Sequence, residues 1–178
     1  PGGPDVAWLD FDGWDTHTQQ NGRLQRQFGA LDSGLAALRE SLGERWADTT
    51  VLVMTEFGRS VALNGSGGTD HGTGGVAFLA GGAVAGGRVL ADWPGLGTRD
   101  LLDGRDLRPT RDVRSLLAPL LQRHLGVGQA AMARALPGAA VRQCVWMDTR
   151  VSVRVTASPP AMRTGQASRW SRPTASLQ

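Results

Sequence analysis

The sequence lacks lysine, isoleucine and tyrosine, and it has a single cysteine in 178 residues. All 19 basic residues are therefore arginine. The missing types share AT-rich codons, which indicates a GC-rich genome. Without lysine there is no Walker phosphate loop, no lysine Schiff base and no pyridoxal chemistry. One cysteine, Cys144, excludes an internal disulfide and every zinc site built on several thiolates. A metal site in this chain must therefore use histidine and carboxylate ligands.

The charge is unevenly distributed. The net charge of +3 and the pI near 10.8 suggest a nucleic-acid-binding protein. However, residues 1–146 carry 14 Arg against 15 acidic residues, whereas residues 147–178 carry five Arg against Asp148 alone. The basic character therefore belongs to the end of the chain and not to a folded face with interleaved aromatic residues. We expect no nucleic-acid partner.

The length predicts one domain with a sizeable core. No apolar run approaches the roughly 18 residues of a membrane span, so no span is expected. Beyond residue 146 the periodic patterns stop. We expect residues 1–140 to form the domain and residues 141–178 to be a disordered basic tail, with a shifted reading frame as the alternative.

One segment has a clear helical period. Its apolar residues recur every three or four positions, and charged residues lie off this stripe. The stripe is Leu24, Phe28, Leu31, Leu35, Leu38, Leu42 and Trp46. Gly29, Gly34 and Gly43 weaken the helix by up to about 1 kcal/mol each relative to Ala. We interpret the stripe as core packing, with a partner-binding face as the alternative.

Three apolar runs predict strands, at residues 6–11, 49–54 and 76–80. The second run is apolar on both faces, which is typical of a strand in the middle of a sheet covered by helices. Together with the helix, this order predicts an α/β fold with a mainly parallel sheet. Residues 86–109 are expected to form loops.

Two further helices are expected near the end of the domain. The first begins with Thr110 as N-cap and ends near Gly126, and Pro119 inside it should kink or split it. The second is a short helix within residues 128–138. His124 lies near the apolar face of the first helix, where packing or helix electrostatics explains it.

Polar residues cluster where the predicted strands end. Asp15 and His17 share one side of an extended chain, since side chains two apart share a face. Glu56 follows a fully apolar strand, where a carboxylate favours a nearby cation. Asp70 and His71 lie between glycines, which allow close backbone approach. Imidazole and carboxylate together suit Zn²⁺, Mn²⁺ or Fe²⁺.

Each cluster also has a structural interpretation. Asp15 and His17 are a weak ligand signature when taken alone. Glu56 can form a salt bridge to Arg59 or cap the turn that follows it. Asp70 can form an Asx turn without any ligand.

The motifs occur in an order and spacing that resemble one family. They are GWDTH at 13–17, TEFGR at 55–59, NGSGGTDHG at 64–72, paired glycines at 81–87 and RDLRPTRDVRSLLAPLLQRHLG at 105–126. Over about residues 6–138 the chain resembles the bacterial domain-of-unknown-function 1501 family, which is related to the alkaline phosphatase and sulfatase superfamily. The resemblance implies a three-layer α/β/α sandwich of the alkaline-phosphatase-like type around a two-metal site, incomplete at its N-terminus.

The resemblance also implies the metal ligands and zinc as the expected cofactor. Asp15, His17 and His71 correspond to the ligands of the first metal. Glu56 replaces the Asp that usually follows the central strand. Asp70 corresponds to a ligand or to a partner of His71.

The chain departs from the superfamily pattern at two points. Phe57 stands where the superfamily usually has a His, which puts the second metal in doubt. The nucleophile has no counterpart before Asp15, so we expect this chain to be the C-terminal portion of a longer protein and to be inactive alone. Thr55 or Thr69 is a substitute nucleophile or, alternatively, a structural residue.

The function implied by the resemblance is metal-dependent hydrolysis of a small phosphate or sulfate ester. Arg59 would contact the anionic group, because its planar fork matches phosphate and sulfate. A salt bridge to Glu56 or to a nearby Asp is the alternative for Arg59. The alternatives for the chain are a non-catalytic structural or binding member of the fold and a truncated product without independent activity. Export to the periplasm or beyond is expected from the resemblance only.

Overall fold

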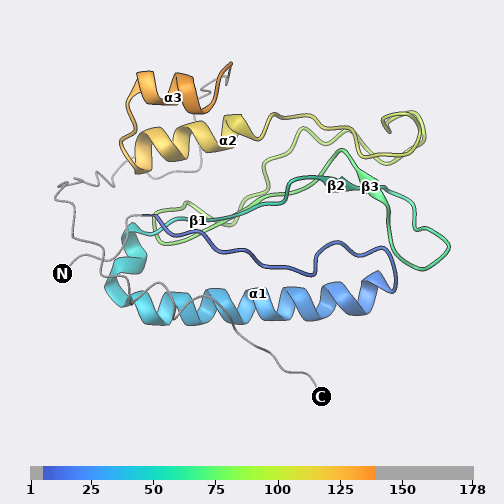
Figure 1. The fold of residues 1–178 in the computed structure, drawn as a ribbon, viewed down its shortest axis with the longest axis horizontal. Helices are drawn as coiled ribbons and strands as arrows, with labels where there is room; N and C mark the ends of the chain where they lie inside the picture. The colour runs from blue at the N-terminus through green and yellow to red at the C-terminus, as the bar shows by residue number, and fades with distance from the viewer. Residues whose placement is uncertain (1–5, 139–178) are drawn as a thin grey trace. The chain divides into compact units, whose positions relative to one another are not determined.

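The computed structural model describes residues 6–138. The described residues belong to two units, residues 6–9 in the first and residues 10–138 in the second. The described part of the first unit, residues 6–9, is exposed and has no helix or strand. The described part of the second unit contains every helix and strand given below (Figure 1). The predicted tail at 141–178 and Cys144 lie outside the described residues.

The longest element is helix α1, Gln20–Leu42, which confirms the predicted helix (Figure 1). It begins after Gln19, which has a φ of 47°, and it ends at Gly43, which has a φ of 53°. A 3₁₀ turn, η1, Gly43–Asp48, continues from it. The α-helix therefore ends earlier than the stripe, because Gly43 has a positive φ and a ψ of −125°, a backbone conformation outside the helical region that glycine tolerates.

The apolar stripe of α1 is its less exposed face. Six of its seven residues are half-buried, whereas Phe28 is 46% exposed. No residue of α1 is fully buried. Phe28 packs edge-to-face on Trp14, with ring centroids 5.1 Å apart. The stripe therefore packs against other described residues on one side of α1, but its side chains remain partly exposed.

Replacement of Gly29 and Gly34 by Ala is expected to stabilise the chain. Both glycines are exposed inside α1, and an added Cβ would meet nothing within 4 Å. Alanine should stabilise by up to about 1 kcal/mol per site, because it restricts the unfolded chain. This corresponds to roughly 2–4 °C per site in a thermal melt.

Gly43→Ala provides the contrast, since the φ of 53° at Gly43 strains any residue with a Cβ. It should lower the melting temperature. If Gly29→Ala and Gly34→Ala also lower it, the helix is not held as described.

The strands form two small antiparallel sheets. β1, Val51–Val53, pairs with β4, Phe78–Ala80, so that Val51 faces Ala80. β2, Gly58–Arg59, pairs with β3, His71–Gly72. The strand predictions at 49–54 and 76–80 are confirmed, and the architecture is mixed α/β.

The predicted parallel pairing is wrong for the described strands. A parallel pair needs a crossover connection, usually a helix. Residues 54–77 instead contain β2 and β3 and no helix, and they return the chain antiparallel to β1. The strand predicted at 6–11 is also wrong, because no ladder to the described residues forms there. Phe11 packs on Trp14 instead, with ring centroids 5.5 Å apart.

Three short helical elements end the described chain. They are α2, Arg114–Pro119; the π-helical turn η2, Leu120–His124; and α3, Gln129–Ala135. Pro119 is the last residue of α2, and the π-turn follows it directly, which confirms the predicted split. Thr110 is not the N-cap. The Asp112 carboxylate accepts the Arg114 backbone N–H at 2.9 Å, just before α2 begins.

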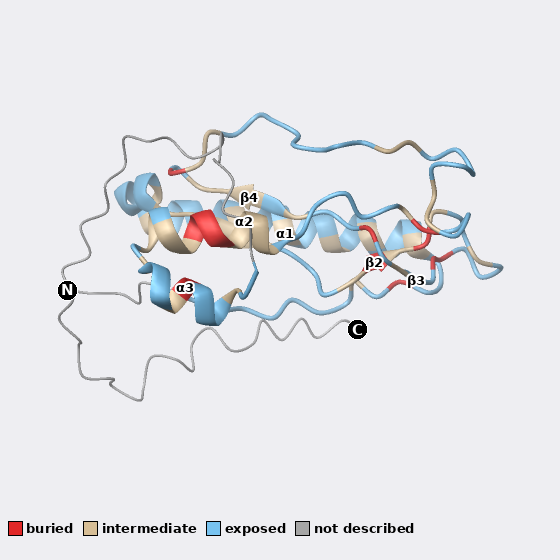
Figure 2. Cartoon of the chain, turned by 90° about the horizontal axis from the view of Figure 1, so that it is seen from above, coloured by how far each residue is buried: buried red, intermediate tan, exposed pale blue. Residues whose placement is uncertain are grey.

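Buried residues fall mainly into two groups of different chemistry (Figure 2). Around α2 and α3 they are apolar, namely Ala118, Pro119, Leu120 and Met132. Around β2 and β3 they are glycine or polar, namely Thr16, Gly58, Ser60, Gly68, Thr69, Gly74 and Asp106. The second group surrounds the candidate site.

No helix within residues 6–138 is both long and apolar enough to cross a bilayer.

Candidate metal centre

Three chain segments meet beside β2 and β3. The residues before α1 run antiparallel to the glycine-rich loop, through a bridge between Thr18 and Gly67. The Thr69 backbone N–H donates to the Thr16 carbonyl at 3.2 Å. In the β2–β3 ladder Arg59 lies opposite His71. These pairings bring Asp15, His17 and His71 together, although more than fifty residues separate His17 from His71.

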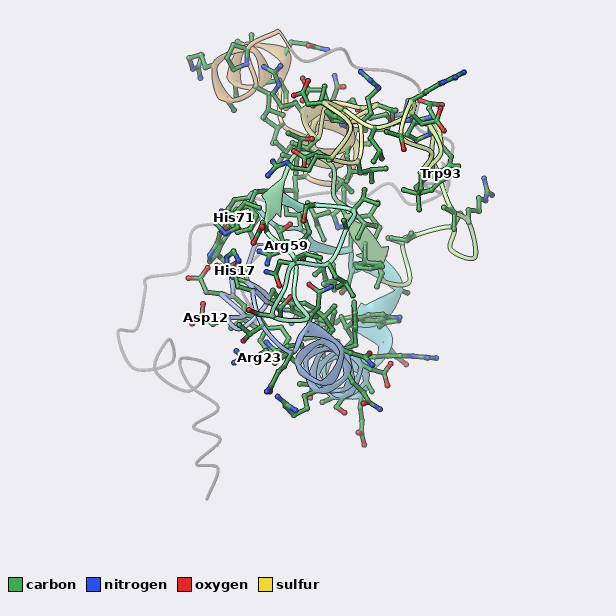
Figure 3. All side chains as sticks on the ribbon, turned by 90° about the vertical axis from the view of Figure 1, so that its right-hand side faces the viewer. Asp12, His17, Arg23, Arg59, His71 and Trp93 are labelled. Carbon is green, nitrogen blue, oxygen red and sulfur yellow. The ribbon has the colours of Figure 1, made fainter. Side chains whose placement is uncertain are left out.

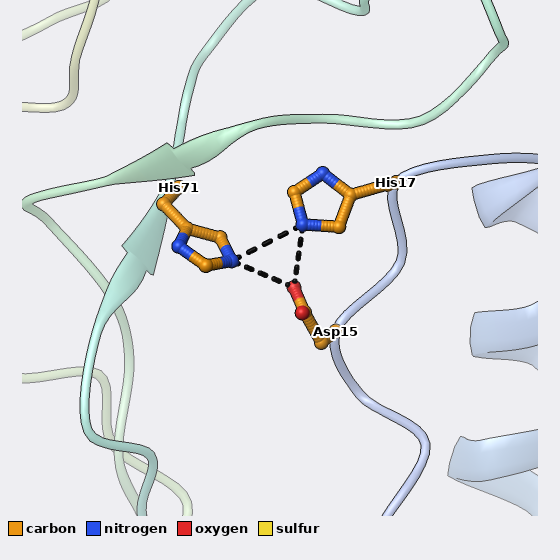
Figure 4. A group of neighbouring side chains, drawn as sticks. All are labelled: Asp15, His17 and His71. Carbon is orange, nitrogen blue, oxygen red and sulfur yellow. Dashed lines mark hydrogen bonds and ion pairs between the residues drawn. The ribbon is translucent and has the colours of Figure 1, made fainter.

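Asp15, His17 and His71 form one cluster (Figure 4). The two Nε2 atoms are 3.1 Å apart. Asp15 Oδ1 lies 3.1 Å from each of them. The three atoms therefore form an equilateral triangle, and they converge on one point beside the ribbon.

The triangle fits a transition-metal ion. Ligand atoms about 2.0–2.1 Å from a tetrahedral zinc ion lie about 3.3–3.4 Å apart, close to the observed separations. Two imidazoles and one carboxylate are ligands that zinc, manganese and iron accept. The three side chains are 46% to 55% exposed. A site with three protein ligands and an open side is typical of catalytic rather than structural zinc.

Asp70 lies behind this cluster and faces His17. Its Oδ1 is 3.5 Å from Nδ1 of His17. A carboxylate on the second nitrogen of a ligating His fixes the ring orientation and raises its basicity. Asp70 therefore contacts His17. The resemblance had implied Asp70 as a ligand or as a partner of His71.

Asn64 organises the glycine-rich loop, and sequence reasoning had missed it. Its Oδ1 accepts the backbone N–H groups of Ser66 at 2.9 Å and Gly68 at 3.1 Å. Its Nδ2 donates to the His17 carbonyl at 2.9 Å and to Asp70 Oδ1 at 3.2 Å. An Asn before a Gly is a turn signal that could have drawn attention to it.

Arg59, which Figure 3 shows near His71, forms an ion pair with Asp15 and not with Glu56. Its Nη1 donates to Asp15 Oδ1, the same oxygen that belongs to the triangle. Its Nε and Nη2 donate to the hydroxyl and carbonyl oxygens of Thr69. The structural alternative for Arg59 is therefore realised, and three of its nitrogens are already engaged.

Both threonines considered as substitute nucleophiles are engaged in hydrogen bonds. The Thr69 hydroxyl donates to Gln20 Oε1 at 2.6 Å, and Thr69 is only 4% exposed. The Thr55 hydroxyl donates to the Phe57 carbonyl at 2.9 Å. These contacts favour the structural interpretation of both residues.

Glycine allows the three segments to approach. A Cβ on Gly68 would lie 2.1 Å from the carbonyl carbon of His17, and a Cβ on Gly72 would lie 2.5 Å from that of Arg59. Both values are shorter than real contacts of a Cβ. The sequence-based expectation of close backbone approach around Asp70 and His71 is confirmed.

Of the five predicted metal ligands, Glu56 and Asp70 lie outside the cluster. Glu56 is exposed, and its role as a ligand stays a prediction. Phe57 stacks on His71, with ring centroids 4.2 Å apart. His124 lies in η2, away from the cluster, as expected for a helix residue.

The surroundings keep both carboxylates ionised. Desolvation would raise the pKa of Asp15, but hydrogen bonds from Arg59 and His71 and the positive charge nearby lower it below the usual value. The hydrogen bond from Asn64 is the main cause of the lowered pKa of Asp70, with His17 adding to it. Ionised carboxylates are the form that binds a metal.

Residues 2–136 match the family described as "Protein of unknown function (DUF1501)". The chain belongs to the DUF1501 family. No curated protein and no solved structure matches it. The DUF1501 match includes the whole cluster, Asp70, the glycine-rich loop and Arg59.

Proposed function

We propose that this chain binds a single divalent transition-metal ion, zinc foremost, through Asp15, His17 and His71. The observation that carries the proposal is the equilateral arrangement of their three ligand atoms, each pair 3.1 Å apart. The partner contact of Asp70 with His17 and the lowered pKa values of both carboxylates support it.

The proposed chemistry is hydrolysis of small phosphate or sulfate esters. Bound zinc would supply Lewis-acid polarisation of an ester oxygen. Asp15, His17 and His71 hold the ion, and their half-exposed side chains leave one side open to a substrate. The fold proposed for this role is the alkaline-phosphatase-like α/β/α sandwich, supported by the resemblance of the motifs to that superfamily and by the grouping of Asp15, His17 and His71.

A non-catalytic binding role is the second candidate. It is favoured by the hydroxyls of Thr55 and Thr69, the two candidate nucleophiles, because both donate to other protein atoms. A protein that binds a metal ion and an oxyanion without catalysing hydrolysis would act as a binding module.

Metal loading of the full chain tests the proposal. We expect the chain, stripped with a chelator and dialysed, to take up one zinc ion per molecule by elemental analysis. A hundredfold excess over the Kd should stabilise it by about 2.7 kcal/mol, or roughly 5–10 °C. Calcium, which prefers oxygen ligands, is the control and should give no shift.

Absence of zinc uptake and of a thermal shift would overturn the metal centre. If zinc binds, the protein as its gene encodes it is loaded with zinc and tested with aryl phosphates and aryl sulfates. Turnover supports the hydrolase, whereas zinc binding without turnover supports the binding module.

A further inference from the structure

A partly buried path of hydrogen bonds leads from the start of α1 to the metal-ligand cluster. Gln20, the first residue of α1, accepts from the hydroxyls of Thr16 at 2.8 Å and Thr69 at 2.6 Å. The Thr69 hydroxyl in turn accepts from Arg59 Nε at 2.9 Å. Arg59 Nη1 donates to Asp15. Gln20, Thr69 and Arg59 thus connect α1 to the ligand atom of Asp15.

The hydrogen-bond path is buried at Thr16 and Thr69, where the residues before α1 meet the glycine-rich loop. Thr16 is 1% exposed and Thr69 is 4% exposed. Hydrogen bonds strengthen in such surroundings, and a buried polar group left without its partner is costly. The Thr69 hydroxyl is therefore restricted to one arrangement, in which it accepts from Arg59 and donates to Gln20.

The planar guanidinium of Arg59 transmits this restriction. Its Nε and Nη2 both donate to Thr69, through the hydroxyl and the carbonyl. Two bonds to one residue fix the plane of the fork. The position of Nη1 is then fixed as well, and so is the hydrogen bond that Nη1 donates to Asp15 Oδ1.

We propose that Thr69 and Gln20 are positioning residues of the metal centre. They fix the Arg59 guanidinium, and Arg59 holds the Asp15 carboxylate with Oδ1 at equal distance from the two imidazoles. Neither residue touches the metal. This inference rests on the proposed metal centre and adds the residues that shape it.

Thr69 and Gln20 contribute to metal binding by orienting Arg59 and Asp15, and not through a charge of their own. The positive charge of Arg59 next to Asp15 opposes a cation by Coulomb repulsion. Replacing Arg59 would therefore have two opposite effects on metal affinity. It would remove the contact that orients Asp15, and it would also remove the repulsion between Arg59 and the cation. Variants of Thr69 and Gln20 keep every charge, so they isolate the orientation.

The test compares Thr69→Val and Gln20→Met with two matched variants of the full chain. Thr69→Ser keeps the hydroxyl. Thr73→Val removes a hydroxyl in the same segment that donates to the Leu107 carbonyl at 3.1 Å and lies outside the path to Asp15. Zinc affinity is measured by competition with a chromophoric chelator. The visible absorption of bound cobalt(II) reports the ligand geometry.

We expect Thr69→Val to weaken zinc binding by on the order of tenfold or more, the usual effect of losing an outer-shell partner, and to change the cobalt spectrum. Thr69→Ser and Thr73→Val should match the wild type in both measurements. Gln20→Met should weaken binding in the same direction, and it decides the matter if Thr69→Val does not fold.

Folded variants at both positions with wild-type affinity and spectrum would overturn the inference while leaving the metal centre intact. Equal weakening by Thr73→Val would also overturn it, because the effect would then be general to the segment. Failure of the wild-type chain to bind zinc would overturn the metal centre and this inference together.

Discussion

His71→Ala is expected to cause a very large loss of zinc affinity. Nε2 of His71 is one of only three ligand atoms in the cluster, 3.1 Å from each of the others. Loss of an outer-shell partner already weakens metal binding by about 10–100-fold. Loss of a direct ligand should therefore exceed about 100-fold, measured by titration calorimetry or chelator competition.

The third histidine provides the matched control. His124 lies in η2, outside the cluster, so His124→Ala removes the same side chain without touching the centre. It should leave the Kd unchanged. Equal losses in both variants would mean that zinc binds nonspecifically to histidine, and unchanged binding in His71→Ala would contradict the assignment of the ligands.

Asp15→Asn tests the carboxylate separately. The replacement keeps the size of the side chain but removes the charge, which zinc requires of an oxygen ligand here. We expect a loss of binding comparable to that of His71→Ala.

The second large effect is expected at Gly68, on stability as well as on metal binding. A Cβ there would lie 2.1 Å from the carbonyl carbon and 2.2 Å from the carbonyl oxygen of His17. Both contacts are with backbone, which cannot rotate away, so the loop and the segment before α1 must separate. Overpacking of this kind costs about 1–3 kcal/mol, and the displacement moves a ligand residue.

Gly65→Ala is the control, because a Cβ at this position in the same loop would meet nothing within 4 Å. Thermal melts of the metal-free chains should show a drop of roughly 2–12 °C for Gly68→Ala and almost none for Gly65→Ala. Zinc affinity should fall in the first variant only. Similar melting temperatures for the two variants would mean that the two segments do not approach as closely as described.

Local patterns in the sequence predicted the helices better than they predicted the sheets, and they drew attention to three residues that the structure brings together, Asp15, His17 and His71. The spacing of Leu31, Leu35, Leu38 and Leu42 defines α1 because helical period is a property of neighbouring residues. Pro119 splits its helix for an equally local reason. The pairing of Asp15 with His17 and the position of His71 between glycines also stand in the sequence itself.

Pairing between distant segments was the part that local patterns could not supply. Residues 6–11 have strand composition, yet a strand needs a partner, and composition does not name one. The antiparallel ladder of β1 with β4 depends on how residues 54–77 return. The ion pair of Arg59 with Asp15 depends on the register of β2 with β3, which places Arg59 opposite His71.

The interior around β2 and β3 is built from glycine and polar residues, whereas that around α2 and α3 is apolar. Opening the first region exposes little hydrocarbon, so it contributes little to the heat capacity of unfolding or to its denaturant dependence. Its order rests on hydrogen bonds, which place it among the parts of a protein that open most readily on their own. A metal ion held by Asp15, His17 and His71 would cross-link the segments at this point. It would thereby stabilise this region against local opening, as a hydrophobic core does in other parts of a protein.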